Sequence, residues 1–267
     1  MGLADVHAHL TDTRLADDEA GVLQRAQAAG VTTIIANGLN PADNAAVLEL
    51  SHRAPMVRPA FGLYPVDAVL NEMRAAGVSY PREGDVASAD EGIAWVREHA
   101  ADAIAIGEIG LDGHWVPEAL WARQEEVFRT LVAIALDADK PIIVHTRRRE
   151  RRCLEILTEM QVTRVNWHCF GGKVNLARSI AERGHLLSIP ANARRSESFT
   201  RMLETLPRDR ILLETDCPYL SPDRARGSEP ADVAGTAAYA AELWGVSLGE
   251  VTAQIEDNFA RLFRTAA

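Results

Sequence analysis

The sequence predicts a single-domain α/β protein folded as a TIM (β/α)8 barrel, and three observations lead to this prediction. Short β-branched or apolar runs alternate with helix-length segments along the whole chain, and such alternation predicts parallel strands joined by crossover helices. Eight of these units fit into 267 residues, which is the size of a closed barrel. No Pro- or Ser-rich linker interrupts residues 1–267, which favours one domain over two smaller ones. An open doubly wound sheet is the alternative, but no Gly-rich phosphate-binding motif follows the first strand.

The elements follow from local patterns, taken in order. Alternation marks the first strand, and a β-branched run, Val31-Thr-Thr-Ile-Ile-Ala36, marks the second. Asn40 and Pro41 form a helix start signal, and the later helices follow from their apolar periodicity. The expected strands are 3–9, 31–36, 56–61, 103–108, 141–145, 164–168, 185–189 and 210–216. The expected helices are 16–29, 41–51, 91–99, 117–136, 149–160, 174–183, 196–206, 231–243 and 248–263.

Residues 66–90 interrupt this alternation. A connection of this length is uncommon in a compact domain and is often a lid over an active site, although a tolerated surface insertion is the plain alternative. Its middle, 69–76, has a helical pattern. We therefore predict an insertion within the barrel.

Composition narrows the class of protein. The chain is 47% hydrophobic and 25% charged, which is ordinary for a globular protein. Three cysteines without paired spacing favour a reducing compartment, and no apolar run approaches the roughly 18 residues that span a bilayer, so we expect a cytoplasmic protein. A net charge of −10 disfavours binding along a duplex, so any nucleic-acid substrate must bind locally, at a short segment or an end. No obligate protein partner is inferred.

Metal-ligand residue types stand at the ends of the expected strands. His7 and His9 alternate on the first strand, so their imidazoles face one side. In a closed barrel the strand ends meet at the C-terminal face, where active sites lie. Four histidines and two carboxylates converge there: His7, His9, Glu108, His145, His168 and Asp216.

Six such ligands exceed what one tetrahedral zinc ion uses, so two divalent cations are the natural interpretation. A glutamate can bridge two cations that activate one water molecule. Imidazole-rich ligation favours zinc or manganese, and magnesium fits if water completes much of its coordination.

These motifs resemble the TatD family of metal-dependent hydrolases in the amidohydrolase superfamily. The matching stretches are Asp5-Val-His-Ala-His9, Gly107-Glu-Ile-Gly-Leu-Asp112, Ile143-Val-His-Thr-Arg147, His168 with Phe170-Gly-Gly172, Glu214-Thr-Asp-Cys-Pro-Tyr-Leu220 and Asn258-Phe-Ala-Arg-Leu-Phe263. The resemblance covers essentially the whole chain in the family's order.

The resemblance implies a deoxyribonuclease-type, two-metal phosphodiesterase that acts on DNA, such as a 3′-5′ exonuclease. It implies that His7, His9 and Asp216 hold one metal, that Glu108 bridges, and that His145 and His168 hold the other. Asp216 would also accept the proton of the attacking water, which makes Asp216 and Glu108 the catalytic pair.

The chain departs from the family pattern at the Gly-x-His-Pro motif, where Tyr64 replaces a histidine associated with the substrate side of the site. Two alternatives to a nuclease stay open. The same metal centre could hydrolyse an ester, lactone or amide, for example in aminoacyl-tRNA deacylation. The chain could also be a non-catalytic metal-binding scaffold.

Other side chains are candidates for supporting roles. Alternate residues of a strand share a face, so Asp5 lies with His7 and Glu214 with Asp216. These carboxylates could orient metal-bound imidazoles, and Asp112 is a similar candidate. Arginines also cluster after three strands, and those of the first cluster, at 147–152, oppose a helix dipole. We therefore expect Arg147 and Arg194, together with Tyr64, to contact the substrate. The tryptophans, Trp115 among them, are expected to be packing residues.

Overall fold

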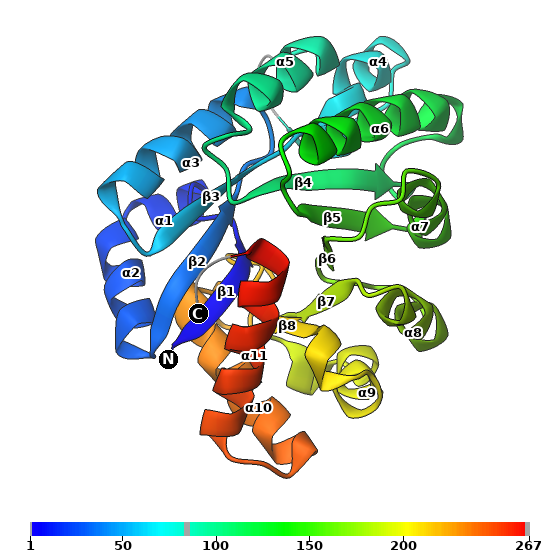
Figure 1. The fold of residues 1–267 in the computed structure, drawn as a ribbon. Coiled ribbons are helices and arrows are strands. Elements are labelled where there is room, and N and C mark those ends of the chain that lie inside the picture. Colours follow the sequence, from blue (N-terminus) through cyan, green and yellow to red (C-terminus); the bar gives the residue numbers. More distant parts are fainter. Residues whose placement is uncertain (1, 83–85, 265–267) are drawn as a thin grey trace.

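The structure, a computed structural model, describes residues 2–82 and 86–264, and it is the predicted eight-stranded barrel (Figure 1). All neighbouring strands are parallel and follow one another in chain order. The strands are β1 (Leu3–Ala8), β2 (Val31–Asn37), β3 (Val57–Phe61), β4 (Ala105–Asp112), β5 (Ile142–Arg147), β6 (Val165–Trp167), β7 (Leu186–Ile189) and β8 (Ile211–Leu213).

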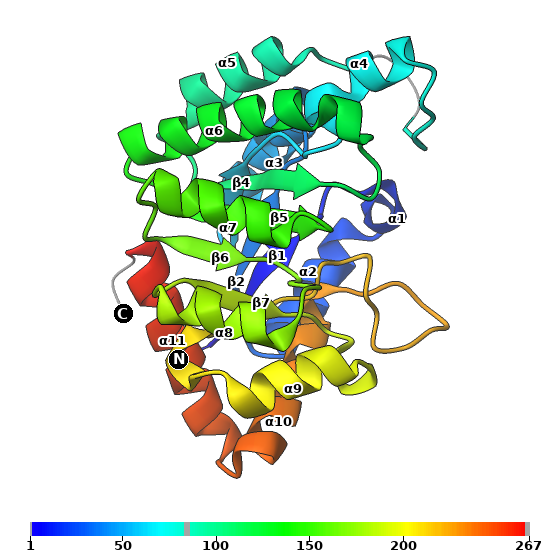
Figure 2. The ribbon, with the colours of Figure 1, turned by 90° about the vertical axis from the view of Figure 1, so that its right-hand side faces the viewer.

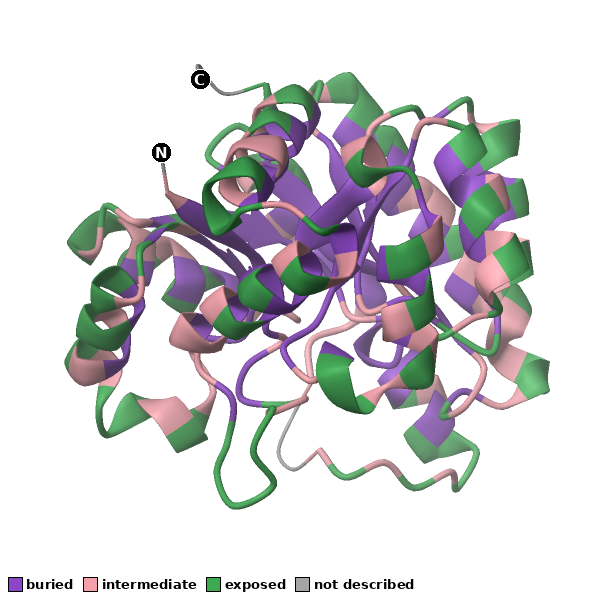
Figure 3. Ribbon diagram, turned by 90° about the horizontal axis from the view of Figure 1, so that it is seen from below, coloured by how far each residue is buried: buried purple, intermediate pink, exposed green. Residues whose placement is uncertain are grey.

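Helices surround this sheet because each crossover must return the chain to the start of the next parallel strand. They are α1 (Thr13–Ala16), α2 (Glu19–Ala28), α3 (Pro41–Arg53), α4 (Leu70–Ala75), α5 (Ala89–His99), α6 (Trp121–Asp137), α7 (Glu150–Glu159), α8 (Val174–Glu182), α9 (Glu197–Thr205), α10 (Val233–Trp244) and α11 (Leu248–Phe263). The strands are buried and the helices are buried along one side (Figure 3). None of the helices in the described residues is long and apolar enough to cross a membrane.

Two backbone hydrogen bonds close the barrel between its first and last strands. The N–H of Asp216 donates to the carbonyl of His7, and the N–H of His9 donates to the carbonyl of Cys217, both at 2.9 Å. Helix α11 packs over this seam against β1 and β8. Figure 2 shows β4 and β5 pointing toward the end where the loop after β8 extends, with the termini toward the opposite end. That loop-bearing end is the C-terminal face.

The ends of β4 and β8 differ most from the prediction. Strand β4 continues to Asp112, because its pairing with β5 runs on until Asp112 lies opposite Arg147. Glu108 therefore lies within β4 and not at its end. Strand β8 ends at Leu213, and the chain turns into a left-handed conformation at Asp216, with φ of 56°.

Two predicted helices also need correction. The helix expected over 16–29 is divided into α1 and α2, with Asp17 and Asp18 between them. The helix expected to begin at 117 begins as α6 at Trp121, after a 3-10 turn. The C-terminal helix expected over 248–263 has those bounds as α11, and Ser247 and Glu250 form a capping box at its start.

The insertion at 66–90 is packed rather than a bare loop, although residues 83–85 lie outside the described residues. It contains a 3-10 turn, Asp67–Val69, and α4. Val66, Val69, Leu70 and Met73 form a small apolar cluster with Val116, which follows β4. The insertion is thereby anchored beside the C-terminal face.

Candidate metal centre

The two histidines of β1 form the first part of the site. His7 is fully buried, and its Nε2 lies 3.3 Å from Nε2 of His9. Nδ1 of His9 lies 3.3 Å from the carbonyl oxygen of Asn37, which can only accept a hydrogen bond. Nδ1 of His9 is therefore the donor, and in the neutral ring Nε2 offers a lone pair to the centre of the barrel.

Asp216 completes a three-donor cluster with these imidazoles. Its Oδ1 lies 3.6 Å from Nε2 of His7 and 3.3 Å from Nε2 of His9. A tetrahedral zinc ion with bonds of about 2.0–2.1 Å holds its donor atoms about 3.4 Å apart. The three donors therefore fit one divalent cation in both spacing and chemistry.

Glu108 lies between this cluster and the other two histidines. Its Oε2 is 3.3 Å from His7 Nε2 and 3.6 Å from His9 Nε2. Its Oε1 is 2.8 Å from His145 Nδ1 and 3.7 Å from His168 Nε2. The two oxygens of one carboxylate thus face two separate groups of imidazoles.

A second three-donor group consists of His7, Glu108 and His168. The imidazoles of His7 and His168 are stacked, with ring centroids 3.6 Å apart. His145 stands at the edge of this group, and at 2.8 Å its ring hydrogen-bonds to Glu108 directly. The six predicted ligands therefore all meet at one place, whereas His145 lies outside both three-donor groups.

Close backbone packing at glycines positions these ligands. A Cβ on Gly62 would lie 2.3 Å from the carbonyl oxygen of Glu108. A Cβ on Gly110, which has φ of 151°, would lie 2.0 Å from the carbonyl oxygen of His145. Only glycine at these positions allows β3, β4 and β5 to approach as they do.

Two of the three predicted supporting carboxylates contact an imidazole. Oε2 of Glu214 lies 3.3 Å from Nδ1 of His168, and the Ser188 hydroxyl donates to the same oxygen at 2.5 Å. Oδ2 of Asp112 lies 3.2 Å from Nε2 of His145. Such contacts fix the orientation and tautomer of a ligand ring.

Asp5 differs from this pattern. It accepts hydrogen bonds from the Thr215 N–H at 2.9 Å, the Thr215 hydroxyl at 2.5 Å and the His7 N–H at 3.3 Å. None of these bonds reaches the imidazole ring of His7, whose Nδ1 has no hydrogen-bond partner in the described residues. Asp5 therefore holds the backbone that precedes Asp216, and burial raises its pKa to about 8.

The electrostatics of the site follow from burial and pairing. Burial opposes protonation of His9, but Asp216 and Glu108 outweigh it and raise the pKa of His9 to about 9. Burial also opposes ionisation of Glu108, yet hydrogen bonds from His145 and His7 hold its pKa well below the usual range. The cluster thus keeps its carboxylates ionised, as cation ligands must be.

A cavity of about 330 Å³ opens over this cluster. Tyr64 and Arg147, two of the residues expected to contact the substrate, line it, and so does Tyr219. The Tyr64 ring meets His145 edge to face, with centroids 5.0 Å apart.

Arg194 lies elsewhere. It is not among the residues that line the cavity; its guanidinium pairs with Glu242 at 2.5 Å and lies over the ring of Tyr239. The arginine clusters look alike in the sequence, and only the fold separates them.

Sequence reasoning missed four residues of this cavity: Leu39, Tyr80, Arg82 and Trp115. Tyr80 and Arg82 belong to the insertion at 66–90, whose length was the only signal. Trp115 was expected to be a packing residue, but it is 36% exposed and meets Tyr80 edge to face at 5.2 Å. The insertion thus contributes part of the cavity wall.

Comparison with known proteins agrees with this geometry. The family model for TatD-related DNase matches residues 4–264. The chain is 32% identical to the uncharacterized metal-dependent hydrolase YabD of Bacillus subtilis, over 98% of this chain and 99% of that protein. It is 28% identical to the human deoxyribonuclease TATDN3, over 98% of this chain and 95% of that protein.

Among solved structures, the TatD homologue YjjV of Escherichia coli superimposes with a TM-score of 0.84 at 24% identity, covering 99% of this chain and 98% of that one. A dihydroorotase from Campylobacter jejuni shares the fold more distantly, with a TM-score of 0.60 at 10% identity, covering 100% of this chain and 85% of that one. The chain belongs to the TatD-related DNase family of metal-dependent hydrolases.

Proposed function

We propose that this protein is a deoxyribonuclease that uses two divalent cations to cleave phosphodiester bonds at DNA ends. The observation that carries the proposal is the position of Glu108, whose Oε2 faces His7 and His9 while its Oε1 faces His145 and His168. A carboxylate between two sets of imidazoles is the arrangement expected of a bridging ligand. Zinc, manganese and magnesium all suit the donor set to different degrees.

In this proposal His7, His9 and Asp216 hold one cation and His145 and His168 the other, with Glu108 between them. Such a pair of cations would lower the pKa of a water molecule bound there and stabilise charge on the attacked phosphoryl group. Asp216, whose second carboxylate oxygen is left for the attacking water, accepts its proton. Glu214 and Asp112 hold the imidazoles of His168 and His145 in place.

Groups in the cavity wall would bind the substrate. Arg147 is exposed and has no ion-pair partner in the described residues, so its guanidinium is free to contact a phosphate oxygen. Burial raises the pKa of Tyr64, so its hydroxyl stays protonated and can donate a hydrogen bond where relatives carry a histidine. The aromatic rings of Trp115 and Tyr219 suit the stacking of terminal bases.

The cavity size supports action at ends. A volume of about 330 Å³ is at the small end of ligand pockets, and the insertion closes one side of it. A strand end enters such a space more readily than the middle of a duplex. The acidic net charge of −10 points in the same direction, because it disfavours binding along a duplex. A cytoplasmic location, as the sequence suggests, fits a substrate of this kind.

The test uses purified protein with end-labelled single-stranded DNA, duplex DNA, a phosphodiester reporter and a carboxylic ester reporter. Each substrate is assayed with zinc, manganese or magnesium, beside Glu108→Gln and Glu108→Ala. We expect metal-dependent shortening of DNA from one end, a metal content near two per chain, and a loss of at least about 100-fold in the variants. Cleavage of the ester alone would replace the proposal with ester hydrolysis, and no turnover with any metal would leave a metal-binding scaffold.

A further inference from the structure

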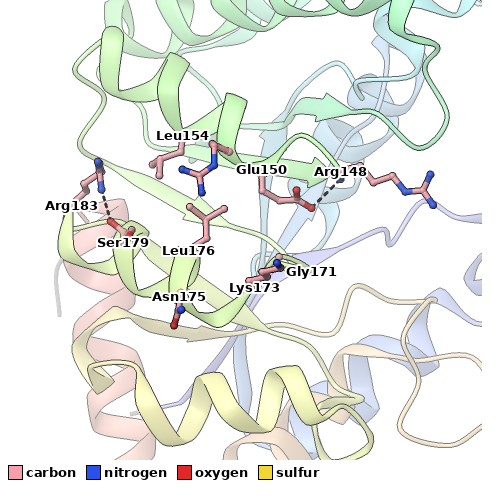
Figure 4. A pocket seen from close by; sticks show the side chains of 11 residues that line it. Arg148, Glu150, Leu154, Gly171, Lys173, Asn175, Leu176, Ser179 and Arg183 are labelled. Carbon is pink, nitrogen blue, oxygen red and sulfur yellow. Dashed lines mark hydrogen bonds between the residues drawn. The ribbon is translucent and has the colours of Figure 1, made fainter.

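A second cavity lies on the side of the barrel, between α7 and α8. Its volume is about 760 Å³. Four exposed cations and one carboxylate line it: Arg148, Arg151, Lys173, Arg183 and Glu150. Figure 4 shows Arg148 and Arg183 at opposite ends, with Glu150 and Lys173 between them. We call this cavity the α7–α8 groove.

The cations of this groove are largely unpaired. In residues 2–82 and 86–264, the side chains of Arg148, Arg151 and Lys173 form no ion pair or hydrogen bond. Among the described residues, Arg183 donates only to the carbonyl oxygen of Ser179, at 2.9 Å. The single carboxylate, Glu150, accepts a hydrogen bond from the backbone N–H of Arg148 at 2.9 Å. In a chain of net charge −10, such a concentration of free positive charge is out of the ordinary.

Arginines close to this groove in the fold differ, because they are paired with carboxylates. On the other side of α7, Arg149 and Arg152 both pair with Glu125. The arginines that line the cavity beside the loop after β8 are paired too. Arg14 pairs with Asp12, Arg25 with Asp18 and Glu229, and Arg226 with Asp232. Cations at the start of α7 also oppose its dipole, so helix stability does not account for them. They are available for an anionic ligand.

The groove adjoins the metal cavity through two loops. After β5, Arg147 lines the metal cavity and the next residue, Arg148, lines the groove. Arg148 has φ of 63°, a conformation that L-residues rarely adopt. After β6, His168 lines the metal cavity and Lys173 lines the groove. The two cavities are therefore one residue apart along the first loop and a few residues apart along the second.

We propose that the α7–α8 groove binds the phosphodiester backbone of the DNA strand whose end is in the metal cavity. This inference rests on the proposed function. The four cations suit phosphates, and the partly exposed Leu176 offers apolar surface for a sugar or base. Helix α8, with 9 residues, is about 13 Å long, which is room for a short single strand.

The test compares the double variant Arg151→Ala/Lys173→Ala with the double control Arg97→Ala/Arg178→Ala. The control removes the same charge from exposed cations that also lack an ion-pair partner in the described residues, and neither lines the groove. Binding of fluorescent dinucleotide, 6-mer and 12-mer single-stranded DNA is measured by anisotropy in the presence of EDTA and at several salt concentrations. Hydrolysis of the dinucleotide and the 12-mer is measured separately, and 12-mer RNA shows whether the groove distinguishes the two polymers.

We expect the groove variant to bind the 12-mer at least about tenfold more weakly than the wild type. Its binding of the dinucleotide and its hydrolysis of the dinucleotide should be unchanged. The slope of log affinity against log salt should fall by about 0.7 for each lost phosphate contact. Equal losses in the control variant, or no dependence of the loss on DNA length, would overturn the groove while leaving the nuclease proposal intact. Absence of hydrolysis by the wild type would overturn the nuclease proposal. The binding measurements would still test the groove by themselves, because a loss of 12-mer binding confined to the groove variant would support it and an equal loss in the control would refute it. Tighter binding of RNA than of DNA would reassign it to RNA.

Discussion

The backbone N–H of Asp216 donates to the carbonyl oxygen of His7 at 2.9 Å, so one hydrogen bond both closes the barrel and joins two residues of the metal cluster. The side chains of the same two residues then meet with Nε2 of His7 3.6 Å from Oδ1 of Asp216. The first strand and the chain after the last strand are therefore held together at the site itself. Damage to this seam should affect folding and metal binding together.

Arg147 and Arg194 form a matched pair of test positions. Arg147→Ala should raise KM for a single-stranded oligonucleotide by about tenfold, because a hydrogen bond to a charged group contributes about 1.5 kcal/mol. Arg194→Ala should leave KM unchanged, since Arg194 pairs with Glu242 away from the cavity. Steady-state kinetics with the labelled oligonucleotide decide this, and equal effects of the two substitutions would refute the placement of Arg147.

Glu214 should control metal affinity through His168. Replacing Glu214 with Gln removes the charge beside Nδ1 of His168, and loss of such a partner lowers metal affinity by about 10–100-fold. Titration against a competing chelator measures this affinity. Thermal unfolding of the metal-free protein should show that the variant is folded, and an unchanged affinity would mean that Glu214 has only a structural role.

Stability of the metal-free protein should fall as pH rises from about 6.5 to 9. Burial disfavours charge on His9, His145 and His168, but neighbouring carboxylates raise the pKa of each to about 9. A histidine with a raised folded-state pKa stabilises fully below its unfolded pKa of about 6.5 and loses that contribution as pH passes its folded value.

Bound metal should reverse this trend, because it requires neutral imidazoles. Calorimetric Tm values for the EDTA-treated and zinc-loaded protein between pH 6.5 and 9 provide the measurement. A metal-free Tm that does not change across this range would show that these histidines are neutral in the folded protein.

Replacing Gly110 and Gly235 with alanine should change the free energy of unfolding in opposite directions. Gly110→Ala forces a Cβ against the carbonyl of His145 in a left-handed conformation, so it should cost at least about 1–3 kcal/mol of unfolding free energy and lower activity. Gly235 lies in α10 with open space around it, so Gly235→Ala should stabilise the protein by about 0.4–1 kcal/mol with unchanged activity. Urea unfolding compares the two, and a neutral Gly110→Ala would contradict the close approach of β4 and β5.

The strand order and the bounds of α11 were predictable because they depend on local patterns. Alternation, β-branched runs and capping signals such as Ser247 with Glu250 are properties of neighbouring residues. The breaks in the pattern were less predictable: β4 runs on past Glu108 because of its pairing with β5, a contact between distant segments.

The sequence by itself determined that six metal-ligand residues lie in or shortly after parallel strands, and therefore that they meet at one face of a barrel. The tertiary structure decided which oxygen of Glu108 faces which imidazoles, that Asp5 supports Thr215 rather than a ring, and which arginines remain free. The physical reason is that a ligand's place along a strand follows from local periodicity, whereas its partners are set by packing between segments far apart in the chain. Whether an arginine is unpaired also depends on packing between distant segments, because an arginine is available to a substrate only where the fold places no carboxylate beside it.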